Sequence, residues 1–266
     1  KYPDIEIPSV GVYQYVISNP YNVPDNKDIF IDGITDERVT FGELKRDSKR
    51  FAAGLQDRIG FKRGTVTAAN PKYTAREFAS QLITSGASVI IVHPKYLDTA
   101  IKAAKEAGIP ESRIFLFGNR EVHGFQSYRS LIGDREAEPV SYSPEEAKNT
   151  TAFLCYSSGT TGIQKAVEIT HTNIIANMAQ ILSSGYFNTR NIFTGALVNF
   201  IPNVYYLKKA INFVYTVPPM ILALVRFPSI ESLSSVEIIF SGAAPLSDGL
   251  IDDFYKLYKI PIRQGY

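Results

Sequence analysis

The 266-residue sequence contains one cysteine, three histidines and no tryptophan. A single cysteine cannot form an internal disulfide, and the apolar run AFLCY around Cys155 predicts a buried, inert thiol rather than a nucleophile. The histidines His93, His123 and His171 lie far apart, with no cysteine or carboxylate partners at metal-ligand spacing. These absences argue against a disulfide scaffold and a protein-held metal cage, so any metal ion is expected to arrive with a nucleotide.

Long apolar runs and an excess of either charge are also missing. No segment approaches the roughly 18 consecutive apolar residues of a membrane span, and the stretch KYPDIEIPSV at the start has no apolar signal region. The 28 basic and 26 acidic residues leave a net charge of +2 without a basic block, which argues against a nucleic-acid partner. The 45% hydrophobic content supports one large or two ordinary domains, and a reducing intracellular compartment is the default.

One stretch, YSSGTTGIQKAVEITH (156–171), gathers small, hydroxylated and flexible residues around a lysine, directly after an apolar run. Glycine adopts positive φ readily and lets backbone N–H groups approach an anion, while hydroxyls and a lysine add further donors. Composition alone leaves an ordinary hairpin turn about equally open, but the ordered string favours a phosphate-binding loop. The candidate phosphate-binding residues are Ser157, Ser158, Gly159, Thr160, Thr161, Gly162 and Lys165.

The flanks of this loop predict a strand, loop, strand unit. The segment TTAFLCYS before the loop is rich in strand formers, and KAVEITH after it alternates, with Val167, Ile169 and His171 on one face. The nucleotide loop G-x-x-x-x-G-K-[ST] is not matched, because the glycines are three residues apart and Ala166 replaces the required hydroxyl. An unrelated α/β nucleotide hydrolase is therefore disfavoured, since its loop would be followed by a helix.

The first half of the chain alternates helices and strands. Capping boxes at Thr40 and at Thr74 predict helices that begin one residue later and run to about 59 and 85. The segments ASVIIVH, LDTAIKAAKEAG and RIFLFG then follow the strand, helix, strand rhythm of a parallel sheet. The acidic segment 133–150 is typical of a linker, so we expect an α/β fold with one subdomain over 1–140 and a second, phosphate-loop subdomain over 141–266.

The second half repeats the rhythm less clearly. Thr172 or Asn173 is expected to cap a helix, whereas 183–209 shows no clear pattern. From 211 onward INFVYTV predicts a strand, two prolines open a helix, and VEIIFSGAAPLS predicts a strand that runs into a loop. Ser247 or Asp248 is expected to cap the last helix.

The string YSSGTTGIQKAVEITH resembles the phosphate-loop signature of the adenylate-forming enzymes, Y-S-S-G-T-T-G-x-P-K-G-V followed by T-H. It departs from that signature at Gln164 and Ala166, where the family usually has proline and glycine. Three further segments resemble the 4-coumarate–CoA ligase-like branch of the family: FIDGITDERVTFGELKRDSKRFAAGL, TAANPKYTAREFASQL with SGASVIIVH, and VPPMILALVRFPSIESLSSVEIIFSGAAPLS. The resemblance implies the family's N-terminal large-domain fold, mostly parallel sheets flanked by helices, with internal deletions.

The same resemblance implies an ATP-dependent acid–CoA ligase that converts an aromatic or fatty carboxylic acid into acyl-AMP and then into a CoA thioester. Its ligands would be the acid, ATP with Mg²⁺, and CoA, in the cytoplasm or the peroxisome. Lys165 would be the catalytic residue, and His171, Gly242 and Ala243 would contact the acid. Beyond the phosphate loop, the nucleotide would be held by Gly242, Ala243, Ala244, Pro245, Gln264, Gly265 and Tyr266.

Parts of the family pattern are missing from the sequence. It stops at Tyr266, before the family's threonine at the α-phosphate, its Mg²⁺-holding glutamate and its C-terminal domain. A helix and a strand are missing between Gly64 and Thr65, and an aromatic-histidine motif of the acyl pocket is missing between about 182 and 211. We therefore expect this chain alone to be inactive, and the alternative hypothesis is a non-catalytic nucleotide-binding pseudoenzyme or truncated remnant.

Overall fold

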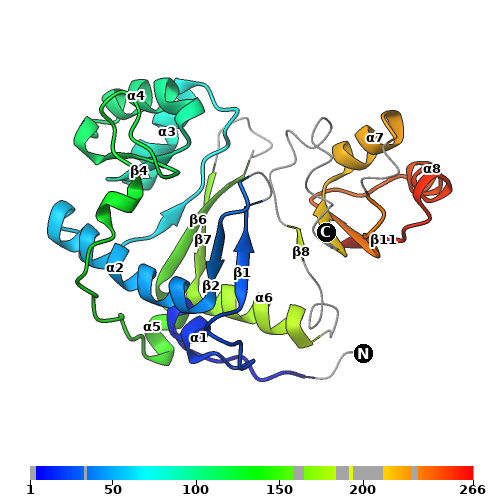
Figure 1. Ribbon diagram of the computed structural model, residues 1–266, viewed down its shortest axis with the longest axis horizontal. Helices are drawn as coiled ribbons and strands as arrows, with labels where there is room; N and C mark the ends of the chain where they lie inside the picture. Colours follow the sequence, from blue (N-terminus) through cyan, green and yellow to red (C-terminus); the bar gives the residue numbers. More distant parts are fainter. Residues whose placement is uncertain are drawn as a thin grey trace. The chain divides into compact units, whose positions relative to one another are not determined.

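The computed structural model describes residues 4–32, 35–157, 165–183, 192–193, 212–228 and 233–265. The chain forms two compact units, each with its own helices and sheet (Figure 1). Unit 1 comprises Lys1–Ile29 and Val39–Ala179, and unit 2 comprises Phe30–Arg38 and Gln180–Tyr266. A hairpin of strands β1 (Asp28–Ile31) and β2 (Arg38–Thr40) leads into the first long helix.

Unit 1 alternates helices and strands. Its α-helices are α1 (Val12–Ser18), α2 (Phe41–Ile59), α3 (Ala75–Ser85), α4 (Leu97–Glu106), α5 (Pro144–Asn149) and α6 (His171–Ser183), the last of which runs past Ala179. Short 3-10 turns are η1 (Pro94–Tyr96), η2 (Glu111–Arg113) and η3 (Tyr128–Leu131). Its strands are β3 (Val66–Thr67), β4 (Ile90–Val92), β5 (Ile114–Leu116), β6 (Thr151–Ser157) and β7 (Lys165–Thr170).

The strands of unit 1 form two sheets. One has the order β3–β6–β7, in which β3 runs parallel and β7 antiparallel to β6; the other is the parallel pair β4–β5. Helices α3 and α4 pack together beside the β4–β5 pair, and alanines on α4 allow this close approach. The buried core there consists of Ala79, Leu82, Ile90, Leu97, Ala100, Ala103, Ala104, Ile109, Ile114 and Leu116.

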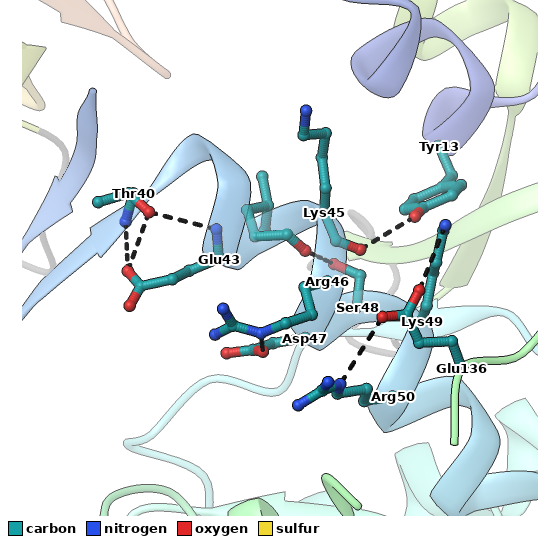
Figure 2. A network of polar contacts seen from close by, with 11 residues as sticks. Tyr13, Thr40, Glu43, Lys45, Arg46, Asp47, Ser48, Lys49, Arg50 and Glu136 are labelled. Carbon is teal, nitrogen blue, oxygen red and sulfur yellow. Dashed lines mark hydrogen bonds and ion pairs between the residues drawn. The ribbon is translucent and has the colours of Figure 1, made fainter. Parts of the chain in front are cut away.

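The two predicted capping boxes are confirmed. Figure 2 shows the first, in which Thr40 Oγ1 accepts from the Glu43 N–H at 3.2 Å and Glu43 Oε2 accepts from the Thr40 N–H at 2.8 Å. Thr74 and Glu77 repeat the arrangement at 3.3 and 2.8 Å, and the Thr74 backbone N–H lowers the pKa of the Glu77 carboxyl. Each cap stabilises its helix by about 1 kcal/mol because it satisfies N–H groups that the helix leaves unpaired.

Unit 2 is a parallel sheet with two helices packed together. The strand order is β11 (Ile262–Gly265), β10 (Ile238–Gly242), β9 (Phe213–Thr216) and β8 (Ile192–Phe193), and the helices are α7 (Pro218–Arg226) and α8 (Asp248–Tyr258). Ser247 caps α8 as expected, and the Tyr258 hydroxyl donates to the Leu224 carbonyl at 3.0 Å, which joins α8 to α7. The core consists of Val214, Ile221, Leu224, Leu233, Val236, Ile239, Leu246, Phe254, Tyr258 and Ile260.

Three expectations differ from the structure. Cys155 is exposed rather than buried, although Phe153 on the same face of β6 is half-buried. The compact units divide between Ala179 and Gln180 rather than at residues 140 and 141, because β6 pairs with β3 and so joins the phosphate-loop hairpin to the first half. Helix α6 begins at His171, and its cap is Thr170, which exchanges hydrogen bonds with Asn173.

No helix in the described ranges is long and apolar enough to cross a membrane.

Candidate functional site

The predicted phosphate loop lies between two strands, as expected. Strands β6 and β7 are antiparallel, and Ser157 pairs with Lys165 at the end of the hairpin where the loop connects the two strands. This pairing places the hydroxyl of Ser157 and the ammonium of Lys165 at the two ends of the connecting loop. Ser158, Gly159, Thr160, Thr161 and Gly162 lie outside the described residues.

The hairpin is anchored to helix α3. The Tyr156 hydroxyl lies 2.7 Å from Thr84 Oγ1, and the buried Gln81 amide donates to Thr67 Oγ1 at 2.8 Å on the neighbouring strand β3. Thr67 Oγ1 in turn donates to the Leu154 carbonyl of β6 at 2.9 Å. The base of the loop is therefore held by side-chain hydrogen bonds in addition to the sheet ladder.

In unit 2, the other predicted site residues meet at the carboxyl ends of β10 and β11. Gly242 pairs with Gly265, and one rung earlier Ser241 pairs with both Thr216 and Gln264. In open α/β sheets, ligands bind outside the carboxyl ends of the strands. The structure thus brings together two sequence segments that were predicted to serve the same ligand.

Backbone geometry at this edge requires small residues. A Cβ atom on Gly265 would lie 2.6 Å from the Phe240 ring, and one on Gly242 would lie 3.3 Å from the Gly265 carbonyl oxygen. Ala243 has φ of 69°, in the left-handed region that costs an L-residue about 1 kcal/mol. Strained backbone of this kind occurs often at ligand-binding sites.

Gln264 holds the loop that follows β10. Its side-chain carbonyl Oε1 accepts a hydrogen bond from the Leu246 N–H at 2.8 Å. The loop Gly242, Ala243, Ala244 and Pro245 is therefore fixed at both ends, by the β10 ladder and by Gln264. Tyr266 lies outside the described residues.

Ser241 and Thr216 were not singled out from the sequence. Both are buried on the same sheet face as Ile239 and Val214, since alternate strand residues share a face, and Ser241 Oγ has no hydrogen-bond partner in the structure. A buried polar atom without a partner is uncommon and often marks a functional region. The sequence signal that could have identified Ser241 as a buried residue was the alternation in VEIIFSG, which places Ser241 two residues after a buried isoleucine.

His171 occupies a structural position in unit 1. Its Nδ1 accepts from the Val12 N–H at 3.2 Å, and its ring lies 4.3 Å from the Tyr142 ring, so it joins α6 to α1. Burial lowers the pKa of His171, which favours the neutral imidazole that this acceptor role needs. Ser157, Lys165 and His171 belong to unit 1, whereas Gly242–Pro245, Gln264 and Gly265 belong to unit 2.

A known protein family and several known proteins match this chain. The profile of the family described as AMP-binding enzyme matches residues 64–202, which is more than half of the chain. The chain therefore belongs to the AMP-binding enzyme family. It is 27% identical to 4-coumarate–CoA ligase 3 of Arabidopsis thaliana, with 100% of this chain and 57% of the relative covered. It is 32% identical to phenylacetyl-CoA ligase epaB of Aspergillus niger, with 69% of this chain and 41% of the relative covered.

Solved structures confirm the fold of the adenylate-forming enzymes. A long-chain-fatty-acid–CoA ligase from Archaeoglobus fulgidus superposes with a TM-score of 0.78 at 19% identity, covering 99% of this chain and 64% of that one. The chain spans about half the length of the relatives that it matches, 57% of the Arabidopsis ligase and 41% of the Aspergillus ligase. The Arabidopsis alignment has 330 positions against 266 residues here, so at least 64 positions of the relative have no counterpart, in agreement with the expected internal deletions.

Proposed function

We propose that this chain carries the nucleotide- and acid-binding part of an ATP-dependent acid–CoA ligase that acts on an aromatic or fatty carboxylic acid. The observation that carries the proposal is the pairing of Gly242 with Gly265, beside a loop held by Gln264, at the carboxyl ends of parallel strands. The small residues Gly242, Ala243 and Ala244 would let the backbone of this loop approach a flat ring closely. Family membership supplies the reaction class, and the names of the relatives support both aromatic and fatty acids.

The proposed reaction has two steps. A carboxylate oxygen attacks the α-phosphorus of ATP, the bond to the bridging oxygen breaks, and pyrophosphate leaves with the electron pair. The thiol sulfur of CoA then attacks the acyl carbon, losing its proton, and AMP departs. No covalent bond to the protein forms, so the protein acts by positioning the reactants and stabilising charge.

Each unit has its own role in this proposal. The loop from Ser157 to Lys165 would bind the β- and γ-phosphates, where negative charge grows as pyrophosphate leaves. The edge formed by Gly242, Ala243 and Gly265 would bind adenine and the acid. Mg²⁺ would enter bound to ATP, as the sequence led us to expect. The cytoplasm and the peroxisome are the proposed compartments.

Lys165→Ala tests the nucleotide role. Calorimetry with ATP and Mg²⁺ should show binding weakened about tenfold, because an ammonium beside the phosphates is removed. The unfolding midpoint should not change, since Lys165 is an exposed loop-end residue. Lys148→Ala is the matched control, because it removes another exposed lysine of unit 1 on helix α5. Equal ATP affinity in the two variants would contradict the assignment of the loop.

Pyrophosphate release tests the reaction class. The assay would combine the chain with ATP, Mg²⁺, CoA and a panel of cinnamate-like and fatty acids. Because this chain alone is expected to be inactive, ATP binding without acid-dependent release is the expected result. Acid-dependent release would support the ligase reaction class and would contradict the expectation that this chain alone is inactive.

A further inference from the structure

We propose that unit 1 contains a second small-molecule site, a cavity of about 900 Å³ that takes an apolar molecule bearing one carboxylate. All of the residues that line it belong to unit 1, His171 among them, whereas the candidate acid-binding residues Gly242 and Ala243 belong to unit 2. Its volume falls within the range of roughly 300–1,000 Å³ that is typical of ligand pockets. The proposal does not depend on the ligase reaction.

The cavity lies where the two sheets of unit 1 fail to join. In the described structure β3 is hydrogen-bonded only to β6, and β4 only to β5, while residues of both strands line the cavity. Val66 on β3 and Ile91 on β4 line it and remain 59% and 44% exposed. Gly64 and Thr65, where the sequence falls short of the family pattern, also lie at the cavity. The family resemblance implies missing chain at this junction, which would account for the uncovered apolar surface.

One wall of the cavity is apolar. Helix α2 contributes Phe51, Ala52 and Leu55, and the segment after the helix contributes Phe61. The Phe51 ring is supported by an edge contact with Tyr128 at 6.0 Å, and the Phe61 ring lies so close over Gly64 that a Cβ atom there would be 2.1 Å from it. These supported aromatic rings offer a fixed surface to an alkyl chain or an aryl ring.

Another part of the cavity lining is polar and is fixed by hydrogen bonds. Gln14 Oε1 accepts from the Gly11 N–H at 2.8 Å and from the Tyr142 N–H at 3.0 Å, which holds the Tyr142 backbone in place. The Tyr142 ring lies against His171, and the Arg63 guanidinium carbon lies 5.6 Å from its centre. Because the chain itself supplies these bonds, this part of the lining is formed before any ligand arrives.

Positive charge predominates around the cavity. The lysines and arginine that line it are Lys49, Lys62 and Arg63, against one carboxylate, Glu138. Figure 2 shows that Lys49 is already paired with Glu136, at 3.4 Å. Among the residues that the structure describes, Lys62 and Arg63 make no ion pair within 4.0 Å. The Glu146 carboxylate accepts a hydrogen bond from the Ser143 N–H, which lowers the pKa of this carboxyl, and Arg63 helps to lower it. Two cations next to an apolar wall match a molecule with an anionic end.

Calorimetry with decanoate, in the absence of ATP, tests the site on the 266-residue chain. Decanoate should bind at one site, and decyltrimethylammonium, with the same chain length and the opposite charge, should bind at least tenfold more weakly. The double variant Lys62→Gln/Arg63→Gln should weaken decanoate binding about three- to tenfold, because two exposed charge interactions are lost. The control Lys102→Gln/Lys105→Gln removes two exposed lysines from α4, away from the cavity, and should leave the affinity unchanged.

Ala52→Phe locates the ligand. A ring at this position would fill the cavity next to α2, so decanoate binding should disappear while far-ultraviolet circular dichroism remains unchanged. If this variant fails to fold, the charge variants decide the question. Absence of decanoate binding, equal binding of the cationic amphiphile, or equal effects of the two double variants would overturn the proposal. Binding that survives Ala52→Phe in a folded protein would place decanoate elsewhere and overturn this site without contradicting the ligase function.

Discussion

Gln264 and Leu246 are 18 residues apart in sequence, and the Gln264 side-chain oxygen accepts the Leu246 backbone N–H at 2.8 Å. The bond ties the end of β11 to the loop that follows β10. A glutamine assigned to the nucleotide by resemblance thus acts through the loop. We regard it as a positioning residue for the proposed adenine and acid site.

Replacing Gln264 with methionine should therefore affect both stability and binding. Loss of the acceptor leaves the Leu246 N–H unsatisfied, which should lower the free energy of unfolding by about 1–2 kcal/mol. Nucleotide binding should weaken because the loop is no longer held. Gln264→Glu retains an acceptor oxygen and should keep most of the stability. Urea unfolding and ATP calorimetry of both variants check this, and equal losses in the two would contradict the role of the acceptor.

Ala243 should be more stable as glycine. Its φ of 69° is unfavourable for any residue with a Cβ atom, and glycine adopts it without steric cost. Ala243→Gly should raise the free energy of unfolding by about 0.5 kcal/mol after the greater chain entropy of glycine is subtracted. Ala244→Gly is the control, because Ala244 has no positive φ, and it should lower stability instead. Urea unfolding curves of the two variants should shift in opposite directions.

Local patterns predicted the elements well where a short segment carries its own signal. The capping residues Thr40, Thr74 and Ser247 set helix starts through bonds to residues three positions away, so the sequence alone contains both partners. The strand, loop, strand unit around Ser157 and Lys165 was predictable for the same reason.

Features that depend on distant segments were not predictable. Cys155 sits in an apolar run but is exposed, because burial depends on what covers the face of β6. The unit boundary falls after Ala179 because β6 pairs with β3, 87 residues earlier at Thr67 and Leu154, and no local pattern reports such pairing. The contact of His171 with Val12 spans 159 residues and gives that histidine a structural setting that its motif does not show.

Two serines of unit 2 should respond to alanine in opposite directions. Ser241 Oγ is fully buried and has no hydrogen-bond partner among the residues that the structure describes, so Ser241→Ala removes an unsatisfied group and should raise the free energy of unfolding by about 1 kcal/mol. Ser247 accepts from the Leu250 N–H as the cap of α8, so Ser247→Ala should lower it by about 1 kcal/mol. Urea unfolding measures both. A loss of stability in Ser241→Ala would show that the hydroxyl has a partner in solution.

His171 should make stability depend on pH. Its Nδ1 accepts the Val12 N–H, which requires the neutral ring, and burial lowers its pKa below the usual value of about 6.5. The unfolded chain therefore binds a proton more readily than the folded chain. The contribution of His171 to stability is fully present above about pH 6.5 and is lost as pH falls from there toward the lowered pKa.

Urea unfolding at a series of pH values between about 7.5 and 5 would measure this dependence, with His171→Asn as the decisive variant. Asparagine offers an acceptor oxygen to the Val12 N–H but does not titrate in this range. The variant should therefore lose less stability than the unmodified chain as the pH falls. His93→Asn is the matched control, because His93 Nδ1 also accepts a backbone N–H, from Lys95 at 3.1 Å, at an exposed position. The control should follow the unmodified chain, and a His171→Asn variant that also does so would show that His171 does not cause the pH dependence.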